Sequence, residues 1–401
     1  MEFITEPKRQ LPIKKECDVF VAGGGIAGAA AAIAAARCGK RVVLAEAECA
    51  LGGLATLGLV TIFLPLCDGE GNQVIFGLGE ELLRLSIQHG FESRYPKAWL
   101  ENGSREERIR QRFQVQYNAQ MFAMLLEQLL LEEGVEILYR TKVYGVDCPQ
   151  NTINAVFLDS KEGRCALRAS TVVDATGDAD ICAFCGDEVA HYTKNRFAAW
   201  HYISGKHGYQ CVPHAVAINC PLPETERTYD GLKSEDETAL IIRGHQEILK
   251  NVIKLRGGKC DGSVVPATIP TVPNVRMTRR IMGHYTLSDT EAFQRFSDCV
   301  GLTGDWRKRG PVYQIPYRCL YSKHVSNLIT AGRCISVDEG MWDITRVIPT
   351  CVVTGQAAGT AAALAADAGT PFGHLDIRLL QNRLKRDGVL LSYPSGIQQP
   401  E

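Results

Sequence analysis

The sequence predicts an α/β protein that combines a parallel sheet, a β-meander and a second region of mixed α and β structure. Three observations lead to this prediction. A strand, a glycine-rich turn, an alanine-rich helix and another strand follow one another between residues 17 and 46. Short apolar runs separated by turns fill residues 135–177, a pattern typical of antiparallel strands. Residues 191–319 then lose the long apolar runs and gain His, Tyr, Pro and Arg.

The first unit follows from its hydrophobic pattern. The apolar run at residues 18–22 predicts a buried strand, and residues 26–38 read "IAGAAAAIAAARC", which predicts a helix. Residues 41–45 predict a second strand. Parallel strands need a crossover connection of this kind, so we interpret the unit as βαβ.

The later elements complete one domain and suggest another. Residues 79–89 and 118–133 predict helices, and the apolar residues 327–330 predict a strand that returns to the first sheet. Residues 348–366 contain no charge, yet their Gly, Ala, Thr and Gln content is weak for a membrane span and predicts a buried helix. We expect residues 1–190 and 320–401 to form one discontinuous domain, and residues 191–319 to form a mixed α+β substrate or cap domain.

Composition disfavours several classes of partner. The formal net charge is −1 and the basic residues are scattered, so neither nucleic acid nor an anionic membrane is an expected partner. The charged N-terminal residues lack the apolar core of a secretory signal.

Fifteen irregularly spaced cysteines predict reduced thiols in a cytoplasmic protein. Cys182 and Cys185 form a CxxC without a second half-site, which predicts structural thiols and no metal centre.

The glycine-rich turn is the first motif with chemical content. Gly23, Gly25 and Gly28 fit GxGxxG, in which the glycines allow a tight turn, the approach of a pyrophosphate and close helix packing. Glu46 follows 18 residues after Gly28, where a carboxylate accepts hydrogen bonds from a ribose and repels a 2′-phosphate. The motif predicts a Rossmann-like dinucleotide site that disfavours NADP; a purely structural glycine turn is the alternative.

Three later blocks indicate which dinucleotide is bound. They read "EAECALGGLAT" at residues 46–56, "VVDATGDAD" at 172–180 and "NLITAGRCIS" at 327–336. In this order they resemble the FAD signatures of the glutathione reductase-like flavoprotein superfamily. The resemblance is strongest to its family of FAD-dependent oxidoreductases with an LGGxAT loop and an AGRC…GQAAG block. It spans nearly the whole chain and implies noncovalent FAD in the discontinuous domain.

The resemblance also implies which residues hold FAD. The helix beginning near Pro349 would direct its N-terminal amides at the flavin and stabilise negative charge on the reduced ring. Each position also has a purely structural alternative. The loop around Gly52 and Gly53 could be a surface turn, Val143 could be an ordinary strand valine, and the helix beginning near Pro349 could simply be one of a close-packed pair. The implied cofactor-binding residues are Ala22, Gly23, Gly25, Ile26, Ala27, Gly28, Glu46, Ala47, Gly52, Gly53, Ala55, Thr56, Val143, Ala175, Thr176, Gly177, Gly332, Arg333, Thr350, Cys351 and Val352.

The implied reaction is hydride transfer between a small organic substrate and flavin N5. It would oxidise a C–H bond beside O or N, or reduce C=C. Arginines would bind a substrate anion or brace the cap through salt bridges. The candidates for substrate contact are Arg276, Arg280 and Trp342, and the candidates for catalysis or positioning are Asp343, Arg346, His201 and Tyr317, each with a structural role as the alternative.

Other functions compete with this interpretation. Residues 54–60 contain no cysteine, which disfavours a flavin disulfide reductase because such enzymes carry a redox CxxxxC after the second glycine-rich loop. A non-catalytic binding or escort protein on the same fold is one alternative, and an NAD-dependent dehydrogenase is another. The later blocks would have no role in an NAD enzyme. The sequence leaves open the substrate, the direction of reaction, the electron acceptor or donor, and the oligomeric state.

Overall fold

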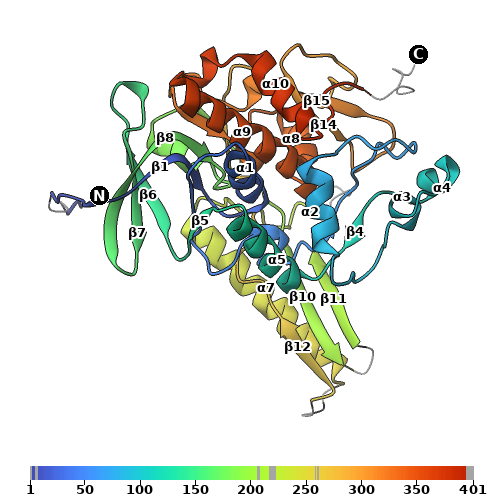
Figure 1. Cartoon of the computed structure of the whole chain (residues 1–401). Coiled ribbons are helices and arrows are strands. Elements are labelled where there is room, and N and C mark those ends of the chain that lie inside the picture. Colours follow the sequence, from blue (N-terminus) through green and yellow to red (C-terminus); the bar gives the residue numbers. More distant parts are fainter. Residues whose placement is uncertain are drawn as a thin grey trace.

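The computed structural model describes residues 2–4, 8–205, 208–215, 223–257, 259 and 262–393. The predicted α/β architecture is confirmed. Its centre is a seven-stranded sheet in the order β5-β2-β1-β8-β7-β6, with β16 paired to β8 (Figure 1). The strands are β1 (Ile13–Ala22), β2 (Val42–Ala45), β5 (Glu136–Leu138), β6 (Lys142–Asp147), β7 (Ala155–Ser160), β8 (Gly163–Asp174) and β16 (Leu328–Thr330).

The register of this sheet brings several strand ends to one edge. β1 runs parallel to β2 and β8, with Ala22 opposite both Ala45 and Asp174. β16 is also parallel to β8, and its Thr330 lies opposite Asp174. The predicted meander is present as antiparallel pairing of β6, β7 and β8. The carboxyl ends of β1, β2, β8 and β16 therefore meet, which is where open α/β sheets bind ligands.

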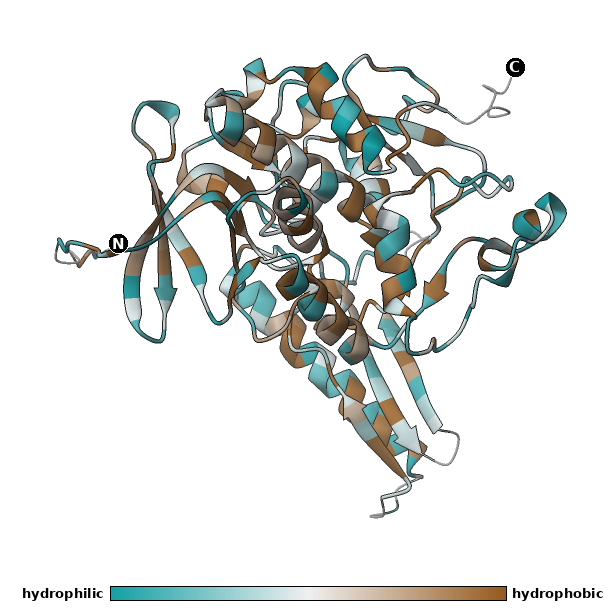
Figure 2. Ribbon diagram, in the orientation of Figure 1, coloured by the Kyte–Doolittle hydropathy of each residue, from teal (hydrophilic) through white to brown (hydrophobic). Residues whose placement is uncertain are grey.

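Two apolar helices pack against each other beside the sheet. The helix α1 (Ile26–Arg37) packs against α9 (Ile348–Ala368), and Figure 2 shows few hydrophilic residues on either. A Cβ on Gly359 would lie 2.0 Å from the Ala31 carbonyl oxygen, so only glycine permits this approach. Among the described residues α9 alone is long and apolar enough to cross a membrane, and 94% of its most apolar window is buried within the protein.

A second sheet projects from the main body (Figure 1). It consists of β10 (Ala198–Gly205), flanked by β11 (Gly208–Ala215) and β12 (Val264–Thr268), and is covered by α7 (Ser234–Leu255). Ala199 and Ile203 of β10 face α7, since Gly244, Ile248 and Val252 pack on them. This sheet and helix lie within the predicted cap.

The hairpin of β14 (Cys299–Gly304) and β15 (Val312–Pro316) shares a hydrophobic core with α1 and α9. The remaining α-helices and strands complete the described structure. These elements are β3 (Ile62–Phe63), α2 (Leu78–Ser86), α3 (Lys97–Leu100), α4 (Arg105–Arg110), β4 (Val115–Gln116), α5 (Ala119–Glu132), α6 (Asp180–Phe184), β9 (Val189–His191), β13 (Arg279–Ile281), α8 (Glu339–Thr345) and α10 (Ile377–Arg386).

Candidate functional site

A cavity of about 710 Å³ lies at the carboxyl edge of the parallel strands. Its walls come from the turns after β1, β2 and β8, from the start of β6, and from residues 331–351. Part of its wall belongs to α7 and to residues 272–275. Its volume falls in the range of ligand-binding pockets. The fold thus gathers segments that are distant in sequence around one space.

The glycine-rich turn has the geometry of a phosphate cradle. A Cβ on Gly28 would lie 1.9 Å from the Gly23 carbonyl oxygen, which makes this glycine necessary for the turn itself. Gly25 differs: a Cβ there meets no atom within 4 Å, and the residue lines the cavity. It is the N-cap of α1, and no side chain caps this helix end. Open space beside uncapped amides fits an anionic group such as a pyrophosphate.

Glu46 closes the same end of the cavity. It is buried, and its carboxylate accepts hydrogen bonds from the Gly24 amide at 2.7 Å and the Glu48 amide at 2.8 Å. Burial raises the pKa of Glu46, and these amide bonds oppose the shift. Each carboxylate oxygen keeps further acceptor capacity. Glu46 therefore suits a ribose hydroxyl, as the motif predicts.

The second glycine-rich loop rests directly on the first. The Gly52 amide donates to the Gly24 carbonyl at 2.8 Å, and an added Cβ on Gly53 would lie 3.4 Å from the Gly25 Cα. Both loop glycines line the cavity. Thr56 instead lies beneath the loop and donates to the Leu51 carbonyl at 2.5 Å. Its role is to hold the loop in shape.

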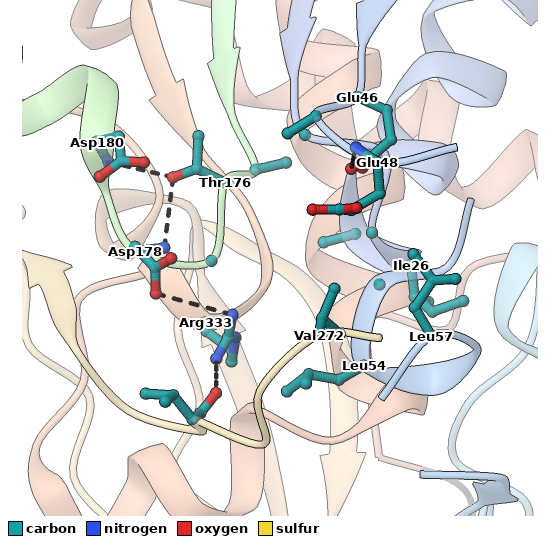
Figure 3. Close-up of a pocket in the computed structure, with 18 of the residues that line it drawn as sticks. Ile26, Glu46, Glu48, Leu54, Leu57, Thr176, Asp178, Asp180, Val272 and Arg333 are labelled. Carbon is teal, nitrogen blue, oxygen red and sulfur yellow. Dashed lines mark hydrogen bonds and ion pairs between the residues drawn. The ribbon is translucent and has the colours of Figure 1, made fainter. Parts of the chain in front are cut away.

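The turn after β8 is built around a residue that the motif analysis did not single out. Asp174 is fully buried and accepts hydrogen bonds from the Thr176 hydroxyl at 2.7 Å and the Cys182 amide at 3.1 Å. An added Cβ on Gly177 would lie 2.1 Å from Arg333 Nη2. Arg333 also donates to the Val275 carbonyl at 2.6 Å, so it ties residues 331–334 to two other walls of the cavity (Figure 3).

Carboxylates lie on two sides of the cavity. Figure 3 shows Asp178 and Asp180 across the space from Glu46 and Glu48. Burial raises the pKa of Asp180 to about 6, and the neighbouring Asp178 adds to this shift. Arg279 forms an ion pair with Asp180. The surrounding carboxylates disfavour an additional phosphate on the ligand.

The structure brings most of the predicted cofactor residues to the cavity. The predicted residues that line it are Gly23, Gly25, Ile26, Ala27, Glu46, Ala47, Gly52, Gly53, Ala55, Val143, Ala175, Thr176, Gly177, Arg333 and Cys351. The cavity lining does not include Ala22, Gly28, Thr56, Gly332, Thr350 or Val352. Thr350, for example, bonds Thr303 through its hydroxyl at 2.7 Å. These residues support the wall from behind.

The other lining residues were not among the predicted contacts. Glu48, Leu54, Asp178, Asp180 and Ala331 lie within the quoted sequence blocks, and the rest come from strand ends, helices and loops outside them. An apolar residue in such a loop gives no signal in a single sequence. These lining residues are Ala45, Glu48, Leu54, Leu57, Thr141, Lys142, Asp178, Asp180, Gly231, Leu232, Glu237, Ile241, Val272, Pro273, Val275, Arg279, Ala331 and Ile348.

The candidate catalytic residues separate into two groups. Arg346 lines the cavity, and its Nε lies 3.0 Å from Asp343 Oδ1. His201 is fully buried on β10, 3.0 Å from the His214 Nε2 through its Nδ1. Tyr317 is buried and donates to the Phe372 carbonyl at 3.1 Å. The cavity lining includes Arg346 but not Asp343, His201 or Tyr317.

The candidate substrate residues also differ in their surroundings. Trp342 is fully buried, and its indole donates to the Arg333 carbonyl at 2.9 Å. Arg280 lies over the Trp342 ring and donates to the Val337 carbonyl. This pair braces the loop that carries Arg333 from behind the cavity. Arg276 lies instead over the ring of Trp200, with its guanidinium carbon 5.2 Å from the centroid.

The CxxC cysteines have the properties of unreactive thiols. Cys182 is fully buried, and burial raises the pKa of its thiol. Burial also raises the pKa of the Cys185 thiol. A raised pKa keeps the thiol protonated, and the thiolate is the reactive form.

Comparisons with solved structures find flavoenzymes with TM-scores below 0.5. The p-nitrophenol 4-monooxygenase PnpA of Pseudomonas putida DLL-E4 has a TM-score of 0.48 and 12% identity, covering 95% of this chain and 91% of that one. A geranylgeranyl bacteriochlorophyll reductase-like protein of Thermoplasma acidophilum has a TM-score of 0.46 and 12% identity, with coverages of 96% and 94%. L-proline dehydrogenase of P. horikoshii has a TM-score of 0.43 and 13% identity, with coverages of 95% and 100%.

A search of curated proteins returns no match. A family model described as FAD dependent oxidoreductase matches residues 18–199 and 188–384. The two matches together extend over most of the chain and include the turn after β1, the turn after β8 and the start of α9. The chain belongs to the family of FAD-dependent oxidoreductases.

Proposed function

We propose that this FAD-dependent oxidoreductase transfers a hydride between a small organic substrate and N5 of FAD. One observation supports this most directly: a single cavity joins the phosphate cradle at Gly25 to the Arg346 side chain and the first turn of α9. FAD, when bound, supplies a ring system that accepts or donates a hydride. The remaining chemistry falls to side chains at the Arg346 end.

The proposed FAD contacts follow from the walls of the cavity. The amides at the start of α1 and the glycines at positions 25 and 53 would hold the pyrophosphate, and Glu46 would accept from a ribose. Backbone groups at Val143 would face the adenine. Assignment to the glutathione reductase-like superfamily is part of this proposal and rests on the order of the sequence blocks. The two-domain division at residues 190 and 320, noncovalent attachment of FAD and cytoplasmic location remain predictions.

The Arg346–Asp343 pair is the proposed substrate-positioning and proton-transfer unit. Asp343 Oδ1 accepts from Arg346, whereas Oδ2 lies 3.8 Å from Arg307 Nη1, beyond hydrogen-bond distance. Oδ2 is the oxygen proposed to take a substrate proton, and Asp343 itself lies outside the cavity lining, held there by Arg346. Arg346 fixes the orientation of this carboxylate and presents its own charge to the cavity.

The decisive experiment is the absorption spectrum of the purified protein, followed by reduction with dithionite and reoxidation in air. We expect two flavin bands in the near-ultraviolet and visible range that bleach and then recover. Rapid reoxidation indicates an oxidase, and slow reoxidation indicates a dehydrogenase or reductase. A colourless protein that also fails to take up added FAD would overturn the proposal and favour a binding protein or an NAD enzyme.

A further inference from the structure

Arg276 carries a positive charge that forms no ion pair with a carboxylate among the described residues. Its guanidinium lies over the Trp200 ring, and within the described residues no carboxylate or carbonyl bonds its side chain. Its backbone amide is held by Asn195 Oδ1 at 3.3 Å, so the residue has a fixed position. An arginine stacked on an aromatic ring keeps the edge of its fork available for in-plane hydrogen bonds.

The arginines around Arg276 show that this situation is unusual. Each of its neighbours in the same region has an acceptor. Arg279 pairs with Asp180, Arg280 donates to Val337, Arg307 pairs with Asp305, Arg333 donates to Val275, and Arg346 pairs with Asp343. Arg276 is the member of this group that lacks one.

The surroundings oppose the charge on Arg276. Burial and the Arg346 guanidinium lower the pKa of Arg276 to about 9, while Asp343 acts in the other direction. Asp343 is already bonded to Arg346 and lies near Arg307. A desolvated cation is costly unless an anion accompanies it. An anionic ligand would remove this cost.

The position of Arg276 connects it to the proposed reaction site. The preceding residue, Val275, lines the cavity, and so does Arg346. Arg276 is not itself a lining residue, but it follows Val275 directly and lies close enough to Arg346 for their charges to interact, while Trp200 belongs to β10. A group held here would lie between the cap and the end of the cavity that contains Arg346.

We propose that Arg276 binds the carboxylate of an anionic organic substrate, with Trp200 beneath its guanidinium and Arg346 at the adjoining wall. A carboxylate fits because its two oxygens match the planar guanidinium fork. The inference rests on the proposed function, since the substrate would reach the flavin from this position.

The test uses the FAD-loaded protein and four probes at equal ionic strength: acetate, succinate, inorganic phosphate and chloride. Each is titrated while the flavin difference spectrum and the melting temperature are recorded. We expect a saturable spectral change and a higher melting temperature with acetate or succinate. The Arg276→Gln variant should weaken carboxylate binding by about 10- to 100-fold, as expected for loss of a charge-assisted pair. Arg276→Lys should recover part of the affinity, because it restores the charge without the fork.

The matched control is Arg108→Gln. Arg108 also lies 5.2 Å from the centre of a tryptophan ring, that of Trp99, but on α4, which contributes no residue to the cavity lining. This variant should bind carboxylate as the wild type does. A purely structural role for Arg276 would lower the melting temperature equally with and without carboxylate, and that result overturns the inference.

The outcomes separate the two proposals. Protein that contains FAD but shows no carboxylate response overturns the role of Arg276 and leaves the flavin function intact. Tighter binding of phosphate or chloride than of either carboxylate overturns the substrate class. An equal response in wild type and Arg276→Gln overturns the site. Absence of flavin in the wild type contradicts the proposed function itself.

Discussion

Gly25 and Gly28 belong to one motif but have different physical roles. The space beside Gly28 is filled by the protein, and the space beside Gly25 is open. The glycine spacing alone locates both residues and the turn, because few other backbones need so many glycines between a strand and a helix. It does not distinguish the two roles, since the distinction depends on atoms from β8 and from the rest of the turn.

Gly25→Ala should separate cofactor binding from folding. The backbone at Gly25 has φ −62° and ψ 176°, which alanine adopts without strain. We expect a folded protein whose FAD affinity falls by at least about tenfold, or about 1.4 kcal/mol, because the methyl group occupies ligand space. Flavin content and FAD titration measure this.

The comparison variant is Gly28→Ala, whose methyl group would collide with the Gly23 carbonyl. It should lower stability even when FAD is absent. If Gly25→Ala purified with normal flavin content and affinity, the space beside it would not be the pyrophosphate site.

Isolated side chains were the least predictable features. On β10, His201 shares the α7-facing side with Ala199 and Ile203, whereas Trp200 points to the opposite side and meets Arg276. A shift of one residue in the strand exchanges the two faces. Histidine is a frequent acid or base in enzymes, but its residue type gives no information about the face on which it lies.

At the scale of elements, hydrophobic pattern predicted the βαβ unit and its crossover closely. The strand β1 is nevertheless longer than predicted, beginning at Ile13 instead of residue 18. Its first residues pair with Ala166–Ala169 of β8. That extension is polar and amphipathic, so only its distant partner reveals it as a strand. Local pattern identifies buried strands more readily than those stabilised by long-range pairing.

Packing makes opposite predictions for two buried helical glycines, Gly359 at the contact between α1 and α9 and Gly244 on α7. Alanine normally stabilises a helix interior by about 1 kcal/mol relative to glycine. At Gly359 its methyl group would lie 2.0 Å from the Ala31 carbonyl oxygen. We therefore expect Gly359→Ala to reduce the free energy of unfolding by about 1 to 3 kcal/mol through overpacking. Urea denaturation measures the change.

Gly244→Ala on α7 is the matched control. Its added methyl group meets Ala199 Cβ at 3.6 Å, an ordinary contact. Helix propensity should then prevail and raise stability by about 0.5 to 1 kcal/mol. Stabilisation by both substitutions would show that α1 and α9 lie farther apart than the structure has them.

For the whole molecule, the motifs predicted the α/β architecture and placed most of the proposed FAD contacts on one cavity. They did so because dinucleotide binding requires backbone contacts at fixed places, which restrict residue type. The proposed substrate end lacks such repeated constraints. Its residues come from β10, residues 272–276 and α8, and their convergence depends on the packing of the entire chain.

Removal of FAD should destabilise the protein as a whole, because the cavity walls come from both the central sheet and α7. A ligand at 100 times its dissociation constant contributes about 2.7 kcal/mol of stability. We expect a lower melting temperature after deflavination and recovery when FAD is added. Calorimetry of the holo and apo forms measures the difference.

The Gly25→Ala variant serves as the control for that measurement. At an FAD concentration that saturates the wild type, its melting temperature should respond less to FAD. Equal melting temperatures of the wild-type holo and apo forms would contradict a linkage between cofactor and fold.

One wall of the cavity is formed by residues 331–351, which are synthesised after all of its other lining residues. The phosphate cradle is complete within the first 53 residues, but β16, Arg333 and the start of α9 lie beyond residue 327. β1 pairs with β8, and β8 pairs with β16, so the carboxyl edge of the sheet cannot be complete until β16 has been synthesised. A nascent chain that lacks residues 331–351 presents the cradle without the wall they form, so we expect it to capture the cofactor only after these residues have been synthesised.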